Sequence, residues 1–154
     1  MAYQKPLDLL LSGKTHWNRW RQAYFDVQAF EPDLHGAQLS GVDLHEADLH
    51  KADLTEANLQ EANLREADLR EADLRHANLR HADLSHANLQ KACLHGADLR
   101  GAILYHTNLK GADCSNADLR GTDPDEADLD GTNIDEASLS RRDLSEMEER
   151  ILPG

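Results

Sequence analysis

The stretch from Ala62 to Leu74, ANLREADLREADL, shows the unit from which most of the chain is built. Each unit has the pattern A-(D/N)-L-x-x, so a leucine recurs at every fifth position and an alanine precedes it by two. The same spacing extends outward to Leu34 and Leu144 without a break in register. Of the 23 central positions, 20 are leucine, and the others are Cys114, Pro124 and Ile134. A period this strict indicates that each unit is a structural unit that stacks on its neighbours.

The period of five decides between the possible architectures. Leucines at every fifth residue spread around a helix that turns by about 100° per residue, so they form no apolar stripe. A coiled coil needs a spacing of about 3.5 residues. In an extended segment, by contrast, alanine and leucine share the inner side, the Asp or Asn between them points outward, and the last two residues suit a turn. The sequence therefore predicts an all-β solenoid, whose most regular central positions are Leu49, Leu54, Leu59, Leu64, Leu69 and Leu74.

The tandem A-(D/N)-L-x-x pattern resembles the pentapeptide-repeat family over about three quarters of the chain. The resemblance implies a right-handed quadrilateral β-helix with four pentapeptides per coil and with alanine and leucine inside. The 23 units would make five to six coils, or a rod about 28 Å long at about 4.8 Å per coil. Arg80, Arg100 and Arg120, which recur every 20 residues, agree with this coil length.

Residues 1–31 differ from the repeats and predict a helical N-terminal cap. A short helix would begin at Pro6 and end at Ser12-Gly13, and Thr15 would cap a second helix. The expected apolar faces are Leu7, Leu10 and Leu11 in the first helix, and Trp17, Trp20, Tyr24 and Val27 in the second. An aromatic binding patch is the alternative, but an uncovered solenoid end would expose strand edges, which favours a cap. The segment also resembles the helical head before the repeats in some bacterial members of the family.

The predicted solenoid spans residues 32–146, and residues 147–154 form a C-terminal capping tail. The segment SEMEERIL, residues 145–152, predicts a short helix that shields the last coil with Met147, Ile151 and Leu152, or that serves in dimerisation, so both monomer and dimer stay open. Pro124 removes a backbone donor from the ladder. We expect a local distortion there without a shift in register, since the spacing resumes at Leu129.

Composition restricts the classes of partner. The net charge of −13 argues against nucleic acid as a direct ligand, because phosphate binding needs clustered Lys and Arg, and it favours basic partners. No apolar run is long enough to span a membrane, and the run from Leu7 to Leu11 is too short for a signal peptide, so we expect a cytoplasmic bacterial protein. Cys114 should point inward and Cys93 outward, which predicts two reduced thiols.

With four units per coil, the acidic residues gather on two opposite sides, those of Leu34 and Leu44, and the recurring arginines lie on the Leu39 side. The candidate interaction surface consists of Asp43, Glu46, Glu66, Asp83, Glu126, Arg80, Arg100 and Arg120. Some members of the family are proposed to imitate duplex DNA and so to occupy type II topoisomerases such as DNA gyrase. The acidic sides support that hypothesis for this chain. The arginine column and the absence of phenylalanine at the central positions argue against it.

The other chemical hypotheses are weaker. His86 and His106 would stack about 4.8 Å apart between Glu66 and Glu126, which resembles a surface zinc or nickel site, but solvated histidines are favoured because no second shell is identifiable. No Walker motif, GxSxG, HExxH or CxxC occurs, and a filled solenoid offers flat sides instead of a pocket. The sequence thus predicts a non-catalytic scaffold without a cofactor that binds a protein partner, with DNA mimicry and surface metal binding as alternatives.

Overall fold

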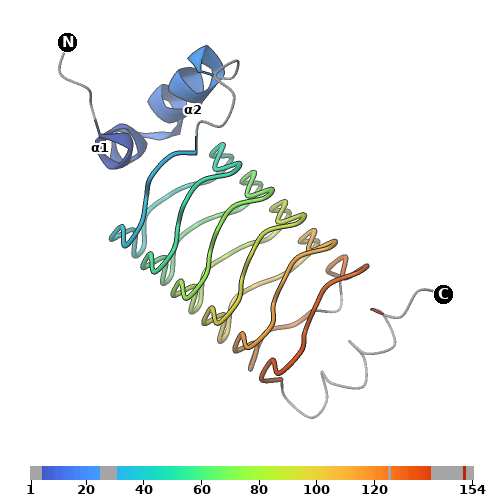
Figure 1. The fold of residues 1–154 in the computed structure, drawn as a ribbon. Helices are drawn as coiled ribbons and strands as arrows, with labels where there is room; N and C mark the ends of the chain where they lie inside the picture. Colours follow the sequence, from blue (N-terminus) through green and yellow to red (C-terminus); the bar gives the residue numbers. More distant parts are fainter. Residues whose placement is uncertain (1–4, 25–30, 125, 140–150, 152–154) are drawn as a thin grey trace.

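The computed structural model describes residues 5–24, 31–124, 126–139 and 151. Two helices, α1 (Pro6–Leu11) and α2 (Lys14–Ala23), precede a rod of stacked coils (Figure 1). Parallel bridges join each outward residue to the residue 20 positions later, from Asp33↔Asp53 to Asp118↔Ser138. Four units therefore complete one coil, which confirms the predicted quadrilateral β-helix. The pairing is confined to one bridged residue per side, so the described coils consist of isolated bridges and turns.

Each corner of the coil is a four-residue turn. The N–H of Ala37 donates to the carbonyl of Leu34 at 3.0 Å, and Ala47 repeats this bond to Leu44 at 3.0 Å. The third residue of such turns has positive φ, which is typical of type II turns. Glycine occupies this position at residues 36, 41, 96, 101, 111, 121 and 131, and elsewhere Glu, Lys, His and Asn adopt a φ of 52° to 60°. The glycines of the repeat therefore mark its corners.

The Asp or Asn of each unit has a structural role that explains its recurrence. Its Oδ1 accepts a hydrogen bond from the backbone N–H two residues later, as between Asp33 and His35 at 3.1 Å and between Asn58 and Gln60 at 3.2 Å. This is an Asx turn, which needs a short side chain with an acceptor. Most of these acidic residues thus stabilise the turns and are only partly free to act as surface charges.

The core consists of two kinds of layer, leucine and alanine, which run through the rod. The predicted central residues Leu49, Leu54, Leu59, Leu64, Leu69 and Leu74 are all 0% exposed. Threonine replaces alanine at three positions in the later coils without leaving a hydroxyl unsatisfied. Thr107 donates to the carbonyl of Leu84 and Thr132 to that of Leu109, both at 2.8 Å, and Thr122 donates to that of Leu119 at 2.7 Å. The departures from the repeat pattern therefore keep the core filled.

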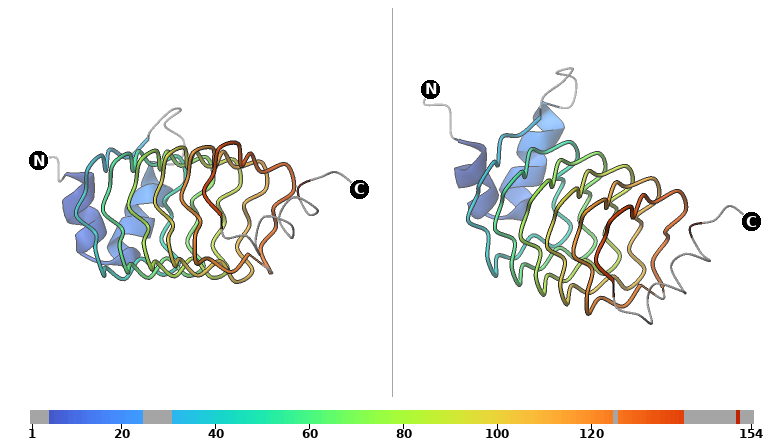
Figure 2. Two further views of the ribbon diagram at one scale, coloured as in Figure 1. Left: turned by 90° about the horizontal axis from the view of Figure 1, so that it is seen from below. Right: turned by 60° about the horizontal axis from the view of Figure 1, so that its bottom comes forward.

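Helix α2 covers the N-terminal end of the stack (Figure 2). Within the stack, an outward residue donates to the preceding coil, as Asp68 does to the carbonyl of Ala47 at 3.0 Å. In the first coil the side chain of Asn18 takes the place of such a neighbour: it accepts from the N–H of Asp48 and donates to the carbonyl of Glu46, both at 2.9 Å. The indole N–H of the fully buried Trp17 donates to the Asp48 carbonyl at 2.7 Å.

The cap differs from the sequence prediction at three positions. Leu11 is 52% exposed, because α1 ends there, and Leu9 packs against the core in its place. The second helix begins at Lys14 after Gly13, whose φ of 108° turns the chain, so Thr15 lies in the first turn and is not the cap. The helix ends at Ala23, with Trp20 partly buried against the core and Tyr24 46% exposed. Val27 lies outside the described residues.

The C-terminal coils keep their register past Pro124. The bridges Ile103↔Asp123 and Asn108↔Asp128 lie on either side of it, and the N–H of Ala127 donates to its carbonyl at 2.9 Å. Of the predicted C-terminal helix only Ile151 is described, and it packs against the core; Met147 and Leu152 lie outside the described residues. Among the residues that are described, no helix combines the length and apolar character needed to cross a membrane.

Candidate interaction surfaces

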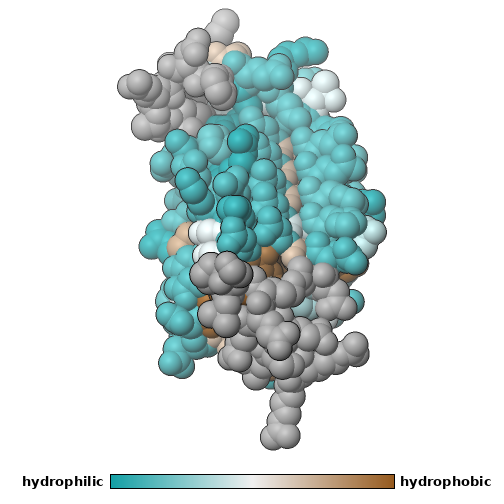
Figure 3. All heavy atoms as spheres, turned by 90° about the vertical axis from the view of Figure 1, so that its right-hand side faces the viewer, coloured by the Kyte–Doolittle hydropathy of each residue, from teal (hydrophilic) through white to brown (hydrophobic). Residues whose placement is uncertain are grey.

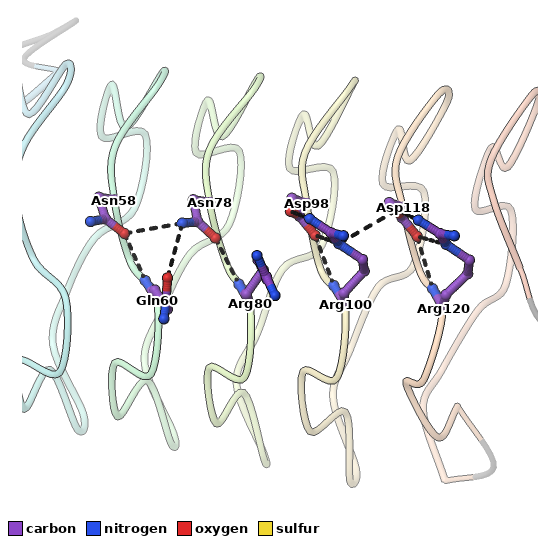
Figure 4. Close-up of polar contacts among 8 residues, drawn as sticks. All are labelled: Asn58, Gln60, Asn78, Arg80, Asp98, Arg100, Asp118 and Arg120. Carbon is purple, nitrogen blue, oxygen red and sulfur yellow. Dashed lines mark hydrogen bonds and ion pairs between the residues drawn. The ribbon is translucent and has the colours of Figure 1, made fainter.

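The Leu39 side, formed by the units centred on Leu39, Leu59, Leu79, Leu99 and Leu119, carries the predicted arginine column. Figure 4 shows that Arg100 and Arg120 fold back over the aspartates of their own units. Arg100 donates to Asp98 through Nε and Nη2 at 2.8 and 2.6 Å, and Arg120 contacts Asp118 in the same way at 2.9 and 2.6 Å. These bonds lower the pKa of both aspartates and raise the pKa of both arginines. Two of the three predicted charges are therefore largely neutralised.

Arg80 differs from its two successors in the column. The outward residue of its unit is Asn78, which accepts the Arg80 backbone N–H at 3.2 Å but offers no carboxylate (Figure 4). The Arg80 Nε is buried and has no hydrogen-bond partner among the described residues. Upstream, Asn78 Nδ2 donates to Asn58 Oδ1 at 3.3 Å, so the column continues as an amide ladder. Among the described residues, the Leu39 side is thus a structural ladder in which Arg80 is the one arginine without a carboxylate hydrogen bond.

The Leu44 side, formed by the units centred on Leu44, Leu64, Leu84, Leu104 and Pro124, carries the predicted acidic residues. Glu46 forms an ion pair with Lys14 of the cap, which lowers the pKa of Glu46. Asp83 lies 3.6 Å from Arg65, the single Lys or Arg among the repeat residues described on this side. Glu66 and Glu126 are exposed at turn positions farther along the rod. The structure therefore ties Glu46 and Asp83 to basic neighbours.

The Leu44 side also bears an exposed apolar and aromatic patch that the sequence analysis did not predict. We call it the aromatic patch; it consists of Ile103, Tyr105, His86 and His106. Ile103 and Tyr105 are each 50% exposed. The Tyr105 ring centroid lies 4.1 Å from that of His106 and 5.5 Å from that of His86, and the two imidazoles lie 5.1 Å apart. Large apolar side chains thus reach solvent on an otherwise hydrophilic rod.

Hydrophobic exposure elsewhere in the described part of the chain is small. The other large hydrophobic residues exposed there are Leu11 and Tyr24 of the cap. Figure 3 shows one face of the rod covered largely by hydrophilic residues, with strongly hydrophobic atoms confined to its lower half, toward the C-terminal coils. Contiguous exposed apolar groups with a polar rim are typical of interaction sites. The aromatic patch is therefore the strongest candidate site on the rod.

A sequence signal for this patch existed. Ile103 is the single aliphatic residue among the 23 outward positions, which otherwise hold Asp, Asn, Gln, Cys or Ser. Tyr105 is the single Phe, Trp or Tyr after Phe30. A comparison of positions 20 residues apart shows that both departures from the repeat lie on one side, the side that carries His86 and His106.

The predicted histidine pair is present, but its surroundings are incomplete for a metal. His86 and His106 stack, and His106 Nδ1 lies 3.9 Å from Glu126 Oε2. Within the described ranges no group of three or more His, Cys, Asp or Glu is placed to hold a metal ion. The rings contact Tyr105 instead, so the histidines contribute to the aromatic patch.

Charge is distributed unevenly along the rod. Residues 32–120 contain 15 Asp and Glu and nine Lys and Arg, whereas residues 121–139 contain seven Asp and Glu and no Lys or Arg. About half of the excess negative charge of the repeats therefore lies in the last coil, directly beyond the aromatic patch. The ion pair of Lys110 with Asp130, at 2.7 Å, brings one cation from the preceding coil.

Comparisons with known proteins agree with the fold. Comparison with curated protein sequences gave no significant match. Among solved structures, the pentapeptide-repeat protein Rfr23 from the cyanobacterium Cyanothece 51142 is 30% identical with a TM-score of 0.68, over 80% of this chain and 96% of that chain. HetL from Nostoc sp. strain PCC 7120, a pentapeptide-repeat protein involved in heterocyst differentiation regulation, is 36% identical with a TM-score of 0.29, over 69% of this chain and 56% of that chain.

The family model for pentapeptide repeats matches residues 33–70, 67–104 and 107–145, which is most of the chain. Proteins of this family form right-handed quadrilateral β-helices and generally act as structural or interaction scaffolds. The period, the four-sided coil and these matches together show that the chain belongs to the pentapeptide-repeat family.

Proposed function

We propose that the protein is a non-catalytic scaffold that binds a protein partner through its Leu44 side, with the aromatic patch at the centre of the interface. The observation that carries this proposal is the half exposure of two large side chains of one repeat unit, Ile103 and Tyr105, on a rod whose other described units expose polar groups. Tyrosine and aliphatic anchors surrounded by polar residues are typical of the centres of protein interfaces. The flat, rigid side of a repeat protein suits such a contact.

The outward carboxylates and the filled core argue against catalysis. Most outward carboxylates are engaged in Asx turns or ion pairs, and the core is filled by Ala and Leu. A general acid–base site needs positioned, partly desolvated groups that are free to exchange a proton. The cytoplasmic location expected from the sequence forms part of this proposal and agrees with the two unpaired cysteines, Cys93 and Cys114.

The test is a comparison of captured proteins between variants of the immobilised rod. The double variant Ile103→Asn/Tyr105→Ser restores residues that other units carry at these positions, as Asn63 and Ser85 do on the same side. The matched control, Leu11→Asn, removes an exposed hydrophobic residue from the cap. A partner captured from an extract of the source cells by the parent protein and by the control, but not by the double variant, supports the proposal. Identical capture by all three would refute it.

A second candidate function is the occupation of a basic DNA-binding cleft, as in type II topoisomerases. The acidic last coil, with seven carboxylates between residues 121 and 139, favours it. The rest of the rod is less suitable: residues 32–120 carry a net charge of −6, or about one charge per 3.5 Å at about 4.8 Å per coil, against about one per 1.7 Å in duplex DNA. A gyrase supercoiling assay tests this candidate, and unchanged supercoiling at micromolar protein would count against it.

A further inference from the structure

The chemistry around the aromatic patch indicates what kind of segment it binds, an inference that rests on the proposed function. The patch has an apolar centre and an acidic rim. Ile103 and Tyr105 form the centre. On the same side, the Glu126 carboxylate occupies the turn position of the next coil, and the Glu66 carboxylate occupies that of the coil before the one that carries His86. Because the two parts differ in chemistry, a ligand that satisfies both must combine an apolar group with a charge.

The sign of that charge follows from the side chains nearby. Beyond Arg65, the described residues of the Leu44 side include no Lys or Arg. The lysine and arginine of the same coil are paired on other sides, Lys110 with Asp130 and Arg120 with Asp118, and Arg100, which precedes Ile103 by three residues, is paired with Asp98. Glu126 has a side chain that is 59% exposed, and its partner is a histidine at 3.9 Å. An incoming cation would thus meet the Glu126 carboxylate, which no Lys or Arg among the described residues neutralises.

The ring geometry favours a cation as well. Tyr105 packs against His86 at an interplanar angle of 87°, and its ring is tilted by 55° to that of His106, while half of the residue stays exposed. A guanidinium or ammonium group within about 6 Å of an exposed tyrosine ring is attracted by its quadrupole. Arginine gains most, because its plane stacks on the ring while its N–H groups reach a carboxylate.

We propose that the Leu44 side binds a basic segment of a partner protein in which an aliphatic side chain packs on Ile103 and a neighbouring arginine or lysine lies over Tyr105 and pairs with Glu126. An acidic or phosphorylated segment would meet repulsion from the rim. A segment with basic residues alone would leave Ile103 exposed to water. The combination of apolar and basic side chains is therefore the recognised feature.

The experiment measures binding of three labelled eight-residue peptides by fluorescence anisotropy. One alternates Arg and Leu, one alternates Arg and Ser, and one alternates Glu and Leu. We expect the Arg-Leu peptide to bind at least tenfold more tightly than either of the others. The double variant Ile103→Asn/Tyr105→Ser should weaken its binding at least tenfold, and Glu126→Lys at least fivefold. The matched control Glu61→Lys makes the same charge change at a turn position of the Leu39 side and should leave binding within twofold.

The outcomes separate this inference from the function on which it rests. Equal binding of the Arg-Leu and Arg-Ser peptides, or equal loss with Glu61→Lys, would show attraction by net charge alone and overturn the inference. So would absence of Arg-Leu binding while patch-dependent capture of a partner persists, and in that case the scaffold function stands. If capture does not depend on the patch, the proposed function itself fails.

Discussion

Asp98 and Arg100, which are separated by one residue, form a bidentate ion pair. Arg100 Nε and Nη2 donate to the two carboxylate oxygens of Asp98 at 2.8 and 2.6 Å, and Asp98 Oδ1 also accepts the Arg100 backbone N–H at 3.2 Å. The carboxylate therefore fixes the turn and neutralises the arginine at once. The bond from the Arg100 side chain, above all, lowers the pKa of Asp98.

Because of this pair, the free energy of unfolding depends on pH in the acidic range. Because the pKa of Asp98 is lower in the folded than in the unfolded chain, the pair stabilises the fold above the ordinary aspartate pKa of about 3.9, and the stabilisation is lost as the pH falls through the lower folded value. We expect Asp98→Asn to lose less stability than the parent protein between pH 6 and pH 2. Urea unfolding at a series of pH values measures this.

The asparagine variant is informative because it retains the turn. Asn58 and Asn78 accept the same backbone bond on the same side of the rod, at 3.2 Å each. The control is Asp33→Asn, at a turn whose second residue after the aspartate is His35 and not an arginine. If Asp33→Asn flattened the pH profile as much as Asp98→Asn, the arginine pairing would not be the cause.

Alanine substitutions at two corner glycines allow the cost of backbone strain to be distinguished from the cost of a steric clash. Gly96 and Gly121 have φ of 67° and 75°, so alanine at either position is strained, by about 1–2 kcal/mol. A Cβ at Gly121 would lie no closer than 3.7 Å to its neighbours, whereas one at Gly96 would lie 2.5 Å from the His76 ring. We therefore expect Gly96→Ala to lower the melting temperature more than Gly121→Ala does.

The His76 ring provides the control for this comparison. In a His76→Ala background the contact disappears, so Gly96→Ala should then cost about as much as Gly121→Ala. A calorimetric melt of the four variants gives the result. Persistence of the larger cost without the ring would show that the contact at Gly96 is not what distinguishes the two corners.

The sequence predicted the repeat architecture well because the whole rod depends on one local rule. Leu49 and Leu69 are 20 residues apart, share a side and are fully buried, as the fivefold period and the family resemblance required. The sequence placed the glycines at turn positions, but only the structure shows that these positions have positive φ, which glycine adopts without strain. A period specifies which residues face inward, and it does not specify backbone dihedral angles.

The candidate site was harder to predict because it consists of exceptions to the period. Ile103 and Tyr105 occupy outward positions whose local geometry the repeat fixes regardless of the side chain. The sequence placed Arg100 in a column of arginines on the Leu39 side, whereas the structure pairs its guanidinium with Asp98 of the same unit. Ion pairing depends on side-chain rotamers, which cannot be predicted from the sequence pattern.

The Asn18→Ala variant tests whether the cap supplies the hydrogen bonds that a preceding coil would otherwise make to the first coil. Its side chain bonds to the carbonyl of Glu46 and the N–H of Asp48, both at 2.9 Å, so Asn18→Ala leaves two backbone groups without these partners. The Asp48 N–H lies in a part-buried hydrogen bond, and the loss of such a bond costs about 0.5–1.5 kcal/mol. We expect amide exchange to accelerate in the first coil, at Asp48 above all, while the amide of Leu89 is unaffected. His16→Ala, in the same helix, is the control, and equal acceleration in both variants would contradict this role of Asn18.

The two cysteines provide a test of inward and outward placement. Cys114 is 1% exposed at a central position, and burial raises the pKa of its thiol to about 12, so almost no thiolate is present at pH 8. Cys93 lies at an outward position with partial exposure. Because alkylation requires an accessible thiolate, iodoacetamide should modify Cys93 in the native protein and both residues only after denaturation. Peptide mapping by mass spectrometry measures the two sites separately, with Cys93→Ser as the control that should stay unlabelled when folded. Labelling of native Cys114 at the rate seen in urea would mean that the fifth-residue positions do not all face the interior of the rod.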